Sequence, residues 1–308
     1  MKYTKFVISN YRAIKGPLEI DISKFGLVPL IGANECGKTS ILQGIFSFDY
    51  TNDKEYEGRH LKEIRNLYEP QNTNMPKIVA YISGKKEEVI NCLDEKLRIK
   101  YVDIDNFTNF TITRTLDGNM EYTISVINDK VDSNLIAREV VQRMPYIIYN
   151  DDFIERPQNL IDIPKNNTEL TGWVGIYERA FNKAKSSIFE RIEEPDENIR
   201  LGIISDVEDE INNTLVKEWS RISLDDGNCL SIKLDIKGNQ NTYKLQVKIK
   251  EKYGTRDRYF DIEERSKGFL WFFNFVMKIK YNPKASGTSD DIIYLLDEPG
   301  SYLHTVAQ

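Results

Sequence analysis

Nine residues near the amino terminus, Gly32–Ser40 (GANECGKTS), constrain this chain more than any other segment. They match the pattern GxxxxGK[ST] at every required position, and this pattern forms a loop whose backbone N–H groups surround phosphate oxygens. Gly32 and Gly37 permit backbone angles and a close approach that a side chain would block. A helix that follows such a loop directs the positive end of its dipole at the phosphates. The segment therefore predicts a strand, a phosphate-binding loop and a helix, the start of an α/β fold.

The polar side chains of the loop predict its ligands. Lys38 is expected to reach the β- and γ-phosphates of a nucleotide, and the Thr39 hydroxyl to ligate Mg²⁺. Ser40 completes the nucleotide-binding loop. Cys36 admits a redox role, although an interior loop residue is expected to contribute only its backbone. The sequence therefore predicts ATP and Mg²⁺ as ligands.

The residues around the loop fit the expected order. Leu27–Ile31 is a short apolar run that predicts a buried strand before the loop, and a helix is expected from Lys38 through Ile41–Phe48. Upstream, Lys5–Ser9 and Leu18–Ile22 alternate apolar and polar residues around a turn-like segment, which predicts an N-terminal β-hairpin.

Far downstream, Ile292–Pro299 (IIYLLDEP) is an apolar strand that ends in two carboxylates. In P-loop proteins such an Asp binds Mg²⁺ and a following residue positions the attacking water. The carboxyl edge of a parallel sheet is also where nucleotides bind in α/β folds. Because adjacent strand side chains point to opposite faces, Asp297 is expected to face the metal and Glu298 the γ-phosphate. A solvated turn is the alternative for these two residues.

Between the two motifs the pattern predicts strands first and helices afterwards. Leu170–Ser220 predicts two or three helices, within a helical insertion at residues 165–222 of a single domain that spans residues 1–308. Leu230–Lys237 and Tyr243–Lys250 predict a second hairpin, and the apolar Gly268–Met277 predicts a buried helix. The remaining expected elements are strands at Ile78–Ile82, Arg98–Ile104, Phe110–Thr115, Glu121–Ile127 and Pro145–Tyr149, and helices around Leu61–Leu67 and at Ser133–Gln142.

Composition limits the functional classes. The net charge of −6 means that any DNA contact must come from a local patch or a partner. Three distant cysteines without a CxxC pair indicate a reducing cytoplasm rather than a disulfide framework or a zinc site. The N-terminus lacks the apolar segment of a signal peptide, and no apolar run approaches the roughly 18 residues of a membrane helix. We therefore expect a soluble cytoplasmic protein without a membrane partner.

A third segment, Asp261–Trp271 (DIEERSKGFLW), has two interpretations. Ser266 is a good N-cap for the apolar helix that follows, so a simple capped helix explains the pattern. Alternatively, Ser266, Lys267 and Gly268 present a helix N-terminus to a phosphate that a second subunit binds.

Three motifs in order, GANECGKTS, RSKGFLWF and LLDEPGSYLH, resemble the ATPase domain of the OLD (overcoming lysogenization defect) family. That family belongs to the ABC-type P-loop ATPases, or AAA family ATPases in the wide sense, together with the SMC and RecF proteins. Asn34, the segment Ile8–Lys15 and the segment Pro145–Phe153 also resemble this group. The resemblance implies an ABC-type fold with a mixed central sheet, an N-terminal antiparallel β-subdomain and a helical insertion.

The resemblance also implies residue roles. Ser266–Gly268 would be the signature segment that acts in trans across a homodimer around two ATP molecules, and Asn34 and Arg12 would lie near the nucleotide. His304 would lie in the D-loop region with a catalytic role across the dimer. For Arg12 and His304 an ordinary surface position is the alternative. Residues 150–152 would occupy the place of the Q-loop without a glutamine, which leaves the role of Asp151 and Asp152 open.

Two departures from the family pattern shape the expected function. Coiled-coil arms are missing, and a compact insertion separates Lys38 from Asp297. The chain also ends before the last strands of an ABC-type domain and before a TOPRIM nuclease domain, so we expect a C-terminally truncated module without nuclease activity of its own. The predicted function is an ATPase that gates a DNA-directed partner or missing TOPRIM domain, in defence against phage. An SMC/RecF-like clamp that closes around DNA in repair is the alternative, and a transporter subunit fits the loop and signature less well.

Overall fold

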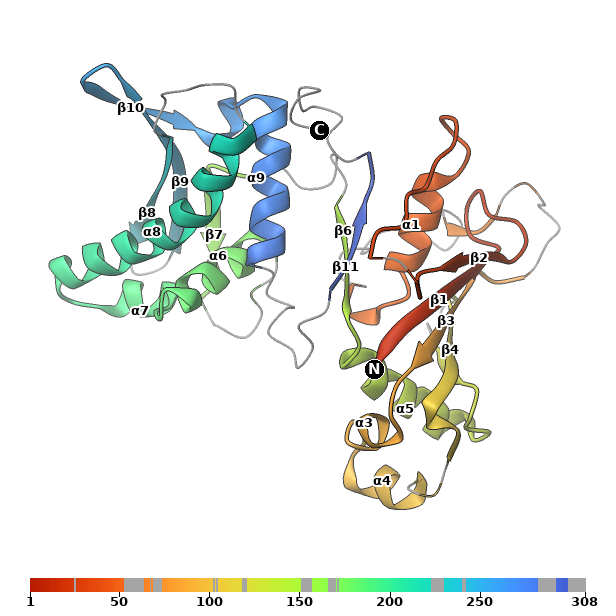
Figure 1. The fold of residues 1–308 in the computed structure, drawn as a ribbon. Helices are drawn as coiled ribbons and strands as arrows, with labels where there is room; N and C mark the ends of the chain where they lie inside the picture. Colours follow the sequence, from red (N-terminus) through yellow and green to blue (C-terminus); the bar gives the residue numbers. More distant parts are fainter. Residues whose placement is uncertain are drawn as a thin grey trace. The chain divides into compact units, whose positions relative to one another are not determined.

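The computed structural model describes residues 1–24, 26–52, 64–66, 68, 74–101, 103, 105–117, 121–150, 157–165, 170, 172–222, 230–239, 242–281 and 292–298. The chain divides into two compact units (Figure 1). The first unit comprises Met1–Asn150 and Gly287–Asp297, and the second comprises Asp151–Ser286 and Glu298–Gln308. Among the described residues, no helix combines the length and the apolar character that crossing a membrane requires.

An antiparallel sheet organises the first unit. In the described part of the chain it has five strands in the order β2-β1-β3-β4-β5. Alternate residues of β1 and its neighbours, such as Phe6, Ile8 and Ile112, are buried in one core, as expected for a sheet with one solvated face. The N-terminal hairpin and three of the predicted strands are confirmed. The strands are β1 (Lys2–Ser9), β2 (Leu18–Asp21), β3 (Lys77–Ser83), β4 (Asn109–Thr115) and β5 (Tyr122–Ile124).

A parallel strand pair forms the second element of this unit. Strands β6 (Tyr146–Asn150) and β11 (Ile292–Leu296) run side by side with Tyr149 opposite Leu295. Helix α1 (Lys38–Phe46) contacts β6, β11 and β1. The α/β fold class is therefore confirmed, and the parallel pair brings together two segments that lie far apart in the sequence.

Buried polar contacts anchor the carboxyl end of α1. The Arg114 guanidinium, which is fully buried, donates a hydrogen bond from Nη1 to the Ser47 carbonyl at 2.7 Å. The Tyr122 hydroxyl donates to the Phe48 carbonyl. Asn52 donates from Nδ2 to the Phe46 carbonyl at 3.2 Å and to the Ile147 carbonyl of β6 at 3.1 Å. These bonds satisfy carbonyls at a helix end, where intrahelical partners run out, and they fix α1 against its strands.

The second unit contains a sheet built around the long strand β9 (Thr242–Tyr253). Strand β8 (Ser231–Asn239) pairs along one edge of β9, and β7 (Leu160–Ile163) and β10 (Arg256–Asp261) follow one another along the other edge. All of these pairings are antiparallel. The predicted hairpin of the second unit is therefore confirmed, with longer strands than the sequence indicated.

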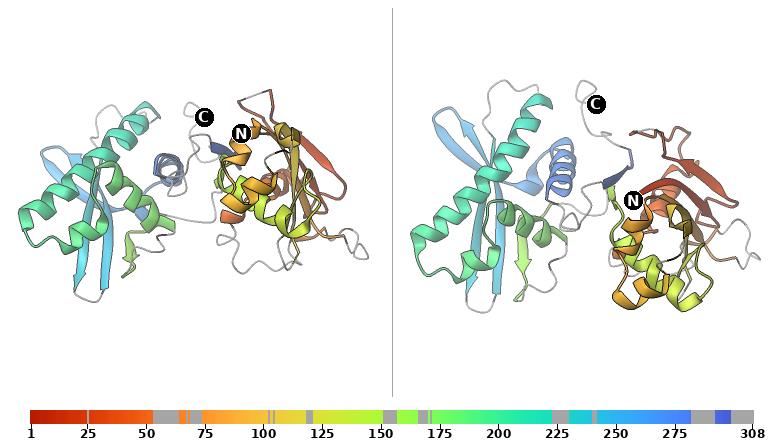
Figure 2. Two further views of the ribbon diagram at one scale, coloured as in Figure 1. Left: turned by 90° about the horizontal axis from the view of Figure 1, so that it is seen from below. Right: turned by 60° about the horizontal axis from the view of Figure 1, so that its bottom comes forward.

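Helices cover the apolar face of this sheet. Buried residues of β8 and β9, such as Leu234 and Ile249, belong to one core with Phe181, Leu215 and Phe273 of the helices. Figure 2 shows α6 and α8 lying alongside the sheet. The predicted helices of residues 170–220 and the predicted helix of Gly268–Met277 are thus confirmed. The helices of this unit are α6 (Gly172–Lys183), α7 (Ile188–Glu193), α8 (Glu197–Ile222) and α9 (Lys267–Lys280), with a short 3-10 helix at Ile262–Glu264.

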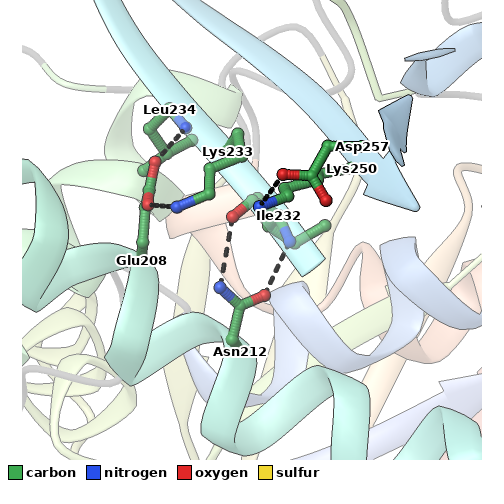
Figure 3. A network of polar contacts seen from close by, with 7 residues as sticks. All are labelled: Glu208, Asn212, Ile232, Lys233, Leu234, Lys250 and Asp257. Atoms are coloured by element: carbon green, nitrogen blue, oxygen red, sulfur yellow. Dashed lines mark hydrogen bonds and ion pairs between the residues drawn. The ribbon is translucent and has the colours of Figure 1, made fainter. Parts of the chain in front are cut away.

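Two side chains of α8 bond to the backbone of β8 (Figure 3). Asn212 accepts a hydrogen bond from the Ile232 N–H at 2.6 Å and donates one to the Ile232 carbonyl at 3.1 Å. Glu208, which is buried, accepts from the Leu234 N–H at 2.8 Å and pairs with the Lys233 ammonium. An edge strand leaves backbone groups unpaired unless something covers them. Helix α8 performs that task for β8.

The expected buried strand at Leu27–Ile31 is wrong. The segment has no strand pairing, and the exposed fractions of Leu27 and Ile31 are 80% and 93%. Pro29 lies in its centre and has no N–H for a ladder hydrogen bond. An apolar run of this length predicts burial only if its backbone can pair.

The expected strand at Arg98–Ile104 is also wrong, because α4 (Glu95–Tyr101) covers its first half. The Asp94 carboxylate accepts a hydrogen bond from the Leu97 N–H at 2.8 Å, as a helix N-cap does. Leu97 and Tyr101, four residues apart on one helix face, pack on the core, whereas Ile99 is exposed. Apolar and polar residues largely alternate along Arg98–Ile104, and this alternation favours a strand over the helical spacing of Leu97 and Tyr101. Two further helices of this unit, α3 (Lys86–Ile90) and α5 (Lys130–Gln142), and a 3-10 helix at Asp105–Thr108 complete the described elements, and α5 confirms the helix predicted at Ser133–Gln142.

The expected helix around Leu61–Leu67 falls largely outside the described residues. The sequence predicts a single domain over residues 1–308. The chain divides into two compact units, and that these form one domain stays a prediction.

Candidate nucleotide-binding site

The predicted phosphate-binding loop leads directly into helix α1. The helix begins at Lys38, and Gly37 is its N-cap with φ of 97°. The Lys38 ammonium donates hydrogen bonds to the carbonyls of Gly32 at 2.9 Å and Ala33 at 2.8 Å. The lysine side chain therefore folds over the loop, where it binds main-chain oxygens.

Close contacts explain the two glycines of the loop. A Cβ atom at Gly32 would lie 2.5 Å from the Cys36 Sγ, and one at Gly37 would lie 3.2 Å from the Ala13 Cβ. Gly37 also has a positive φ, which side chains adopt only with strain. The Cys36 Sγ therefore lies close to Gly32 within the loop, although the Cys36 side chain is exposed. The turn that contains Ala13 lies against the start of α1.

Most described non-glycine residues with positive φ lie in the segments that the sequence motifs identify. The described non-glycine residues with positive φ are Asn10 (56°), Arg12 (47°), Glu35 (65°), Lys185 (60°) and Glu298 (47°). All except Lys185 belong to the turn after β1, to the phosphate-binding loop or to the acidic strand end. Such strain costs about 1–3 kcal/mol for each residue and is concentrated at functional sites.

Hydrogen bonds connect α1 to the acidic strand end. Gln43 of α1 donates from Nε2 to the Tyr149 hydroxyl oxygen at 3.4 Å. The Tyr149 hydroxyl donates to Oδ2 of Asp297 at 2.9 Å. On the other side of Gln43, Arg12 donates from Nη1 to the amide oxygen of Gln43. Arg12, Gln43, Tyr149 and Asp297, which we call the Arg12–Asp297 chain, all lie in the first unit.

This chain of bonds also locates Thr39. Residues four apart on a helix share a face, so Thr39 lies on the same face of α1 as Gln43, one turn closer to the loop. Gln43 meets β6 at Tyr149, the residue before the last one of that strand. Thr39, whose side chain is exposed, therefore belongs to the part of α1 nearest the carboxyl ends of β6 and β11.

The residues present fit a magnesium ion. A hydroxyl at Thr39 and a carboxylate at Asp297 are hard oxygen donors, which Mg²⁺ prefers. Asp297 is partly exposed, and the bond from Tyr149 holds one of its oxygens, Oδ2. A carboxylate has about four lone-pair positions, so acceptor capacity for a cation remains. Thr39 and Asp297 would hold the ion together with phosphate oxygens of a nucleotide.

The other predicted loop residues are placed as follows. Asn34 is exposed in the loop, and Ser40 is buried in the first turn of α1. A buried Ser40 side chain leaves its backbone N–H as the group that can serve a phosphate. Glu298 is exposed directly after Asp297, where its backbone turns away from the strand path.

The third predicted segment is a capped helix. Ser266 is the N-cap of α9, and its Oγ accepts a hydrogen bond from the Phe269 N–H at 3.3 Å. Ser266 and Lys267 are exposed, whereas Gly268 is buried against the core of the second unit. The structural interpretation is confirmed, and the role in trans stays a prediction. His304, Asp151 and Asp152 lie outside the described residues.

Sequence reasoning missed Gln43 and Tyr149. The only available signals were a polar residue on the buried side of a helix and a tyrosine at the end of an apolar strand. Neither pattern indicates a partner, because Gln43 and Tyr149 are separated by 106 positions and Tyr149 and Asp297 by 148.

Fold and site define the class of this protein. It is an α/β protein with a P-loop, a helix that starts at the loop lysine, and a parallel strand pair that ends in a carboxylate. No protein-family model matches the sequence, and no curated protein matches it.

The solved structures that match include two SMC head domains and a structure titled for SMC ATPases. An SMC head bound to the C-winged helix domain of ScpA has 12% identity and a TM-score of 0.48, over 100% of this chain and 91% of that chain. The SMC head domain from Thermotoga maritima has 11% identity and a TM-score of 0.37 over the same shares, 100% and 91%. A third structure, titled for ATP-driven dimerization and DNA stimulated activation of SMC ATPases, has 11% identity and a TM-score of 0.34, over 67% of this chain and 99% of that chain. At these values the likenesses decide neither family nor activity.

Proposed function

We propose that this chain is the ATP-binding and ATP-hydrolysing module of an OLD-like protein. The observation that carries the proposal is the Arg12–Asp297 chain, which connects the helix of the P-loop to the acidic strand end through Gln43 and Tyr149. Two motifs at opposite ends of the sequence thereby belong to one compact unit. P-loop NTPases use this combination of a phosphate-binding loop and a metal-binding carboxylate for phosphoryl transfer.

The proposed mechanism assigns one task to each residue. Lys38 and the N–H groups of the loop bind the β- and γ-phosphates, and Arg12 and Asn34 lie near the nucleotide. Thr39 and Asp297 hold Mg²⁺, which supplies charge neutralisation on the phosphate oxygens. Glu298 accepts a proton from the attacking water while the water oxygen bonds to the γ-phosphorus and the bond to the ADP oxygen breaks. Positioning and charge stabilisation carry most of this catalysis.

We further propose that two copies dimerise around ATP, with Ser266–Gly268 of one copy facing the γ-phosphate bound by the other. The exposed Ser266 and Lys267 at the start of α9 support this arrangement, because a helix N-terminus favours an anion. His304 would complete the site across the dimer. The ATPase cycle would gate a DNA-directed partner or a TOPRIM domain, in defence against phage in the cytoplasm.

Light scattering on the Glu298→Gln variant tests the dimer. The variant should bind ATP and Mg²⁺ and turn ATP over only slowly, and its mass should double when both are added. The same variant with Lys38→Ala is the control and should remain a monomer. A mass of Glu298→Gln that stays that of one chain in saturating ATP contradicts the dimer, and a Ser266→Arg substitution that leaves dimerisation intact contradicts the role of that segment.

A second candidate is the SMC/RecF-like clamp that binds DNA directly and does not cleave it. The solvated face of the sheet in the second unit favours it, because six lysines lie there among the alternate residues of β8 and β9: Lys233, Lys237, Lys244, Lys248, Lys250 and Lys252. Within the described ranges, carboxylates pair with five of these lysines, Lys233, Lys237, Lys244, Lys248 and Lys250, so DNA phosphates would have to displace them. The test measures ATP-dependent retention of DNA after Lys244 and Lys248 are replaced by Gln. Weaker retention would support the clamp, and unchanged retention would contradict it.

A further inference from the structure

Every hydrogen bond of the Arg12–Asp297 chain points in the same direction. A guanidinium has donors only, so Arg12 can bond only the amide oxygen of Gln43. This leaves the amide nitrogen of Gln43 to donate to the Tyr149 oxygen, and it leaves the Tyr149 proton to donate to the Asp297 carboxylate. The Arg12–Asp297 chain therefore runs from a cation, Arg12, to an anion, Asp297, through two neutral side chains. The two charged ends determine how these neutral side chains are oriented.

Burial strengthens this arrangement. Gln43 and Tyr149 are 5% and 8% exposed, so water competes little for the two central bonds. Aligned hydrogen bonds polarise one another, and a low local dielectric raises the strength of each bond. A carboxylate that receives such a bond is held in one orientation, whereas a fully hydrated carboxylate rotates.

The backbone at Arg12 is held in place for this contact. Arg12 has φ of 47°, and its N–H donates to the Ile64 carbonyl at 2.9 Å. The Asn66 N–H donates to the Asn10 carbonyl at 3.1 Å, so a second segment holds both sides of the turn. The strained turn thus presents the Arg12 guanidinium to α1. The backbone hydrogen bonds to Ile64 and Asn66 offset the conformational cost of the turn.

We propose that Gln43 and Tyr149 are positioning residues that orient the Asp297 carboxylate for the metal of the ATP site, and that Arg12 fixes the orientation of the Gln43 amide. This inference rests on the proposed ATPase function and extends it to two residues to which no motif assigns a role. Groups that orient a metal ligand typically contribute 10–100-fold to metal affinity. A hydrogen bond that merely attached β6 to β11 or to α1 would contribute to folding and not to the Mg²⁺ requirement.

The test measures the Mg²⁺ concentration at which a fluorescent ATP analogue is half-bound, with Tyr149→Phe beside the parent chain. The substitution removes only the hydroxyl, and the half-saturating Mg²⁺ concentration should rise about 10–100-fold. Binding of the analogue in EDTA should stay within about twofold of the parent, since Lys38 and the loop are intact. The matched control is Tyr146→Phe on the same strand, which should leave the Mg²⁺ requirement unchanged.

Gln43→Glu provides an independent variant of the same length. A carboxylate at this position still accepts a bond from Arg12, but it offers no N–H to Tyr149 and competes with Asp297 for the phenol proton. It should raise the Mg²⁺ requirement as Tyr149→Phe does, and the double variant should be no worse than the more affected single variant, because both act through one contact. If Tyr149→Phe fails to fold, Gln43→Glu alone carries the prediction.

The outcomes separate the two proposals. A parent chain that binds no ATP analogue with Mg²⁺ overturns the proposed function and this inference with it. A parent chain that binds normally, with the same Mg²⁺ requirement in Tyr149→Phe and Gln43→Glu, overturns the positioning role alone. A lowered melting temperature with an unchanged Mg²⁺ requirement overturns it as well, since it shows a purely structural contact.

Discussion

The Lys38 ammonium lies 2.9 Å from the carbonyl oxygen of Gly32, so the loop lysine binds the main chain of its own loop. Phosphate oxygens of a nucleotide would compete with this carbonyl for the same donor. Because an anionic phosphate is a stronger acceptor than a carbonyl, we expect Lys38 to exchange one for the other when ATP binds.

Lys38→Ala should therefore abolish nucleotide binding without harming the fold. ATP hydrolysis should fall at least about 100-fold, the size of effect that follows removal of one electrostatic contact to the reacting group. The free energy of unfolding should change by no more than about 0.5 kcal/mol, since the lost bonds lie at an exposed loop. Phosphate-release assays and urea unfolding measure the two effects. Lys77→Ala, an exposed lysine at the start of β3, is the control, and a Lys38→Ala chain with parental turnover would refute the site.

Glu298→Gln should separate binding from turnover. The amide keeps the size of the side chain at a position with φ of 47°, so the backbone at the strand end should be unaffected. The variant should bind ATP within about threefold of the parent, whereas turnover should fall about 10²–10⁴-fold if Glu298 is the general base. Equilibrium binding and single-turnover hydrolysis distinguish the two. Parental turnover would exclude Glu298 from this role.

Local signals explain which parts of the site could be predicted. Helix α1 starts at the predicted residue, Lys38, because the loop motif, the glycine N-cap and the apolar spacing all lie within a few positions of each other. The strand expected at Leu27–Ile31 fails because pairing depends on a distant partner and Pro29 weakens it.

The contacts that make up the site are beyond the reach of local patterns. Asp297 was predicted from its own strand, but its bond to Tyr149 joins residues 148 positions apart. Only the tertiary arrangement of α1, β6 and β11 makes Gln43 a neighbour of Tyr149. Long-range side-chain contacts of this kind leave no periodicity in a single sequence.

The edge of β8 offers a stability prediction. Asn212→Ala removes both hydrogen bonds to Ile232. The N–H and the carbonyl of Ile232 then lack the side chain that covers them. Each buried backbone group that is left unsatisfied costs about 1–3 kcal/mol. Because water gains partial access to the two groups, we expect the free energy of unfolding to fall by about 1–3 kcal/mol in total. Urea unfolding measures this loss. Asn213→Ala, an exposed asparagine on the same helix, should change stability by less than about 0.5 kcal/mol, and equal effects of the two substitutions would contradict the edge-capping role.

Glu178 of α6 offers a pH-dependent prediction for the second unit. The residue is 7% exposed, and its carboxylate accepts a hydrogen bond from the Ile188 N–H at 2.8 Å. Burial raises the pKa of Glu178 above its ordinary value of 4.5, and the bonds from Ile188 and Ser187 only partly oppose this shift. The folded state therefore holds the proton more tightly than the unfolded state does. The resulting stabilisation is complete below pH 4.5 and is lost as the pH rises through the folded-state pKa.

Glu178→Gln should remove this pH dependence, because the amide is uncharged at every pH and its oxygen can still accept from Ile188. Relative to the parent, the free energy of unfolding of the variant should increase between pH 4 and pH 7 and then level off above the folded-state pKa. Urea unfolding at pH steps of about 0.5 across this window measures the difference, since each unit of pKa shift is worth about 1.4 kcal/mol. Glu193→Gln, at an exposed position of α7 where solvent screens the charge, should follow the parent curve. A difference between Glu178→Gln and the parent that stays constant from pH 4 to pH 7 would show that the buried carboxylate titrates as it does in the unfolded chain.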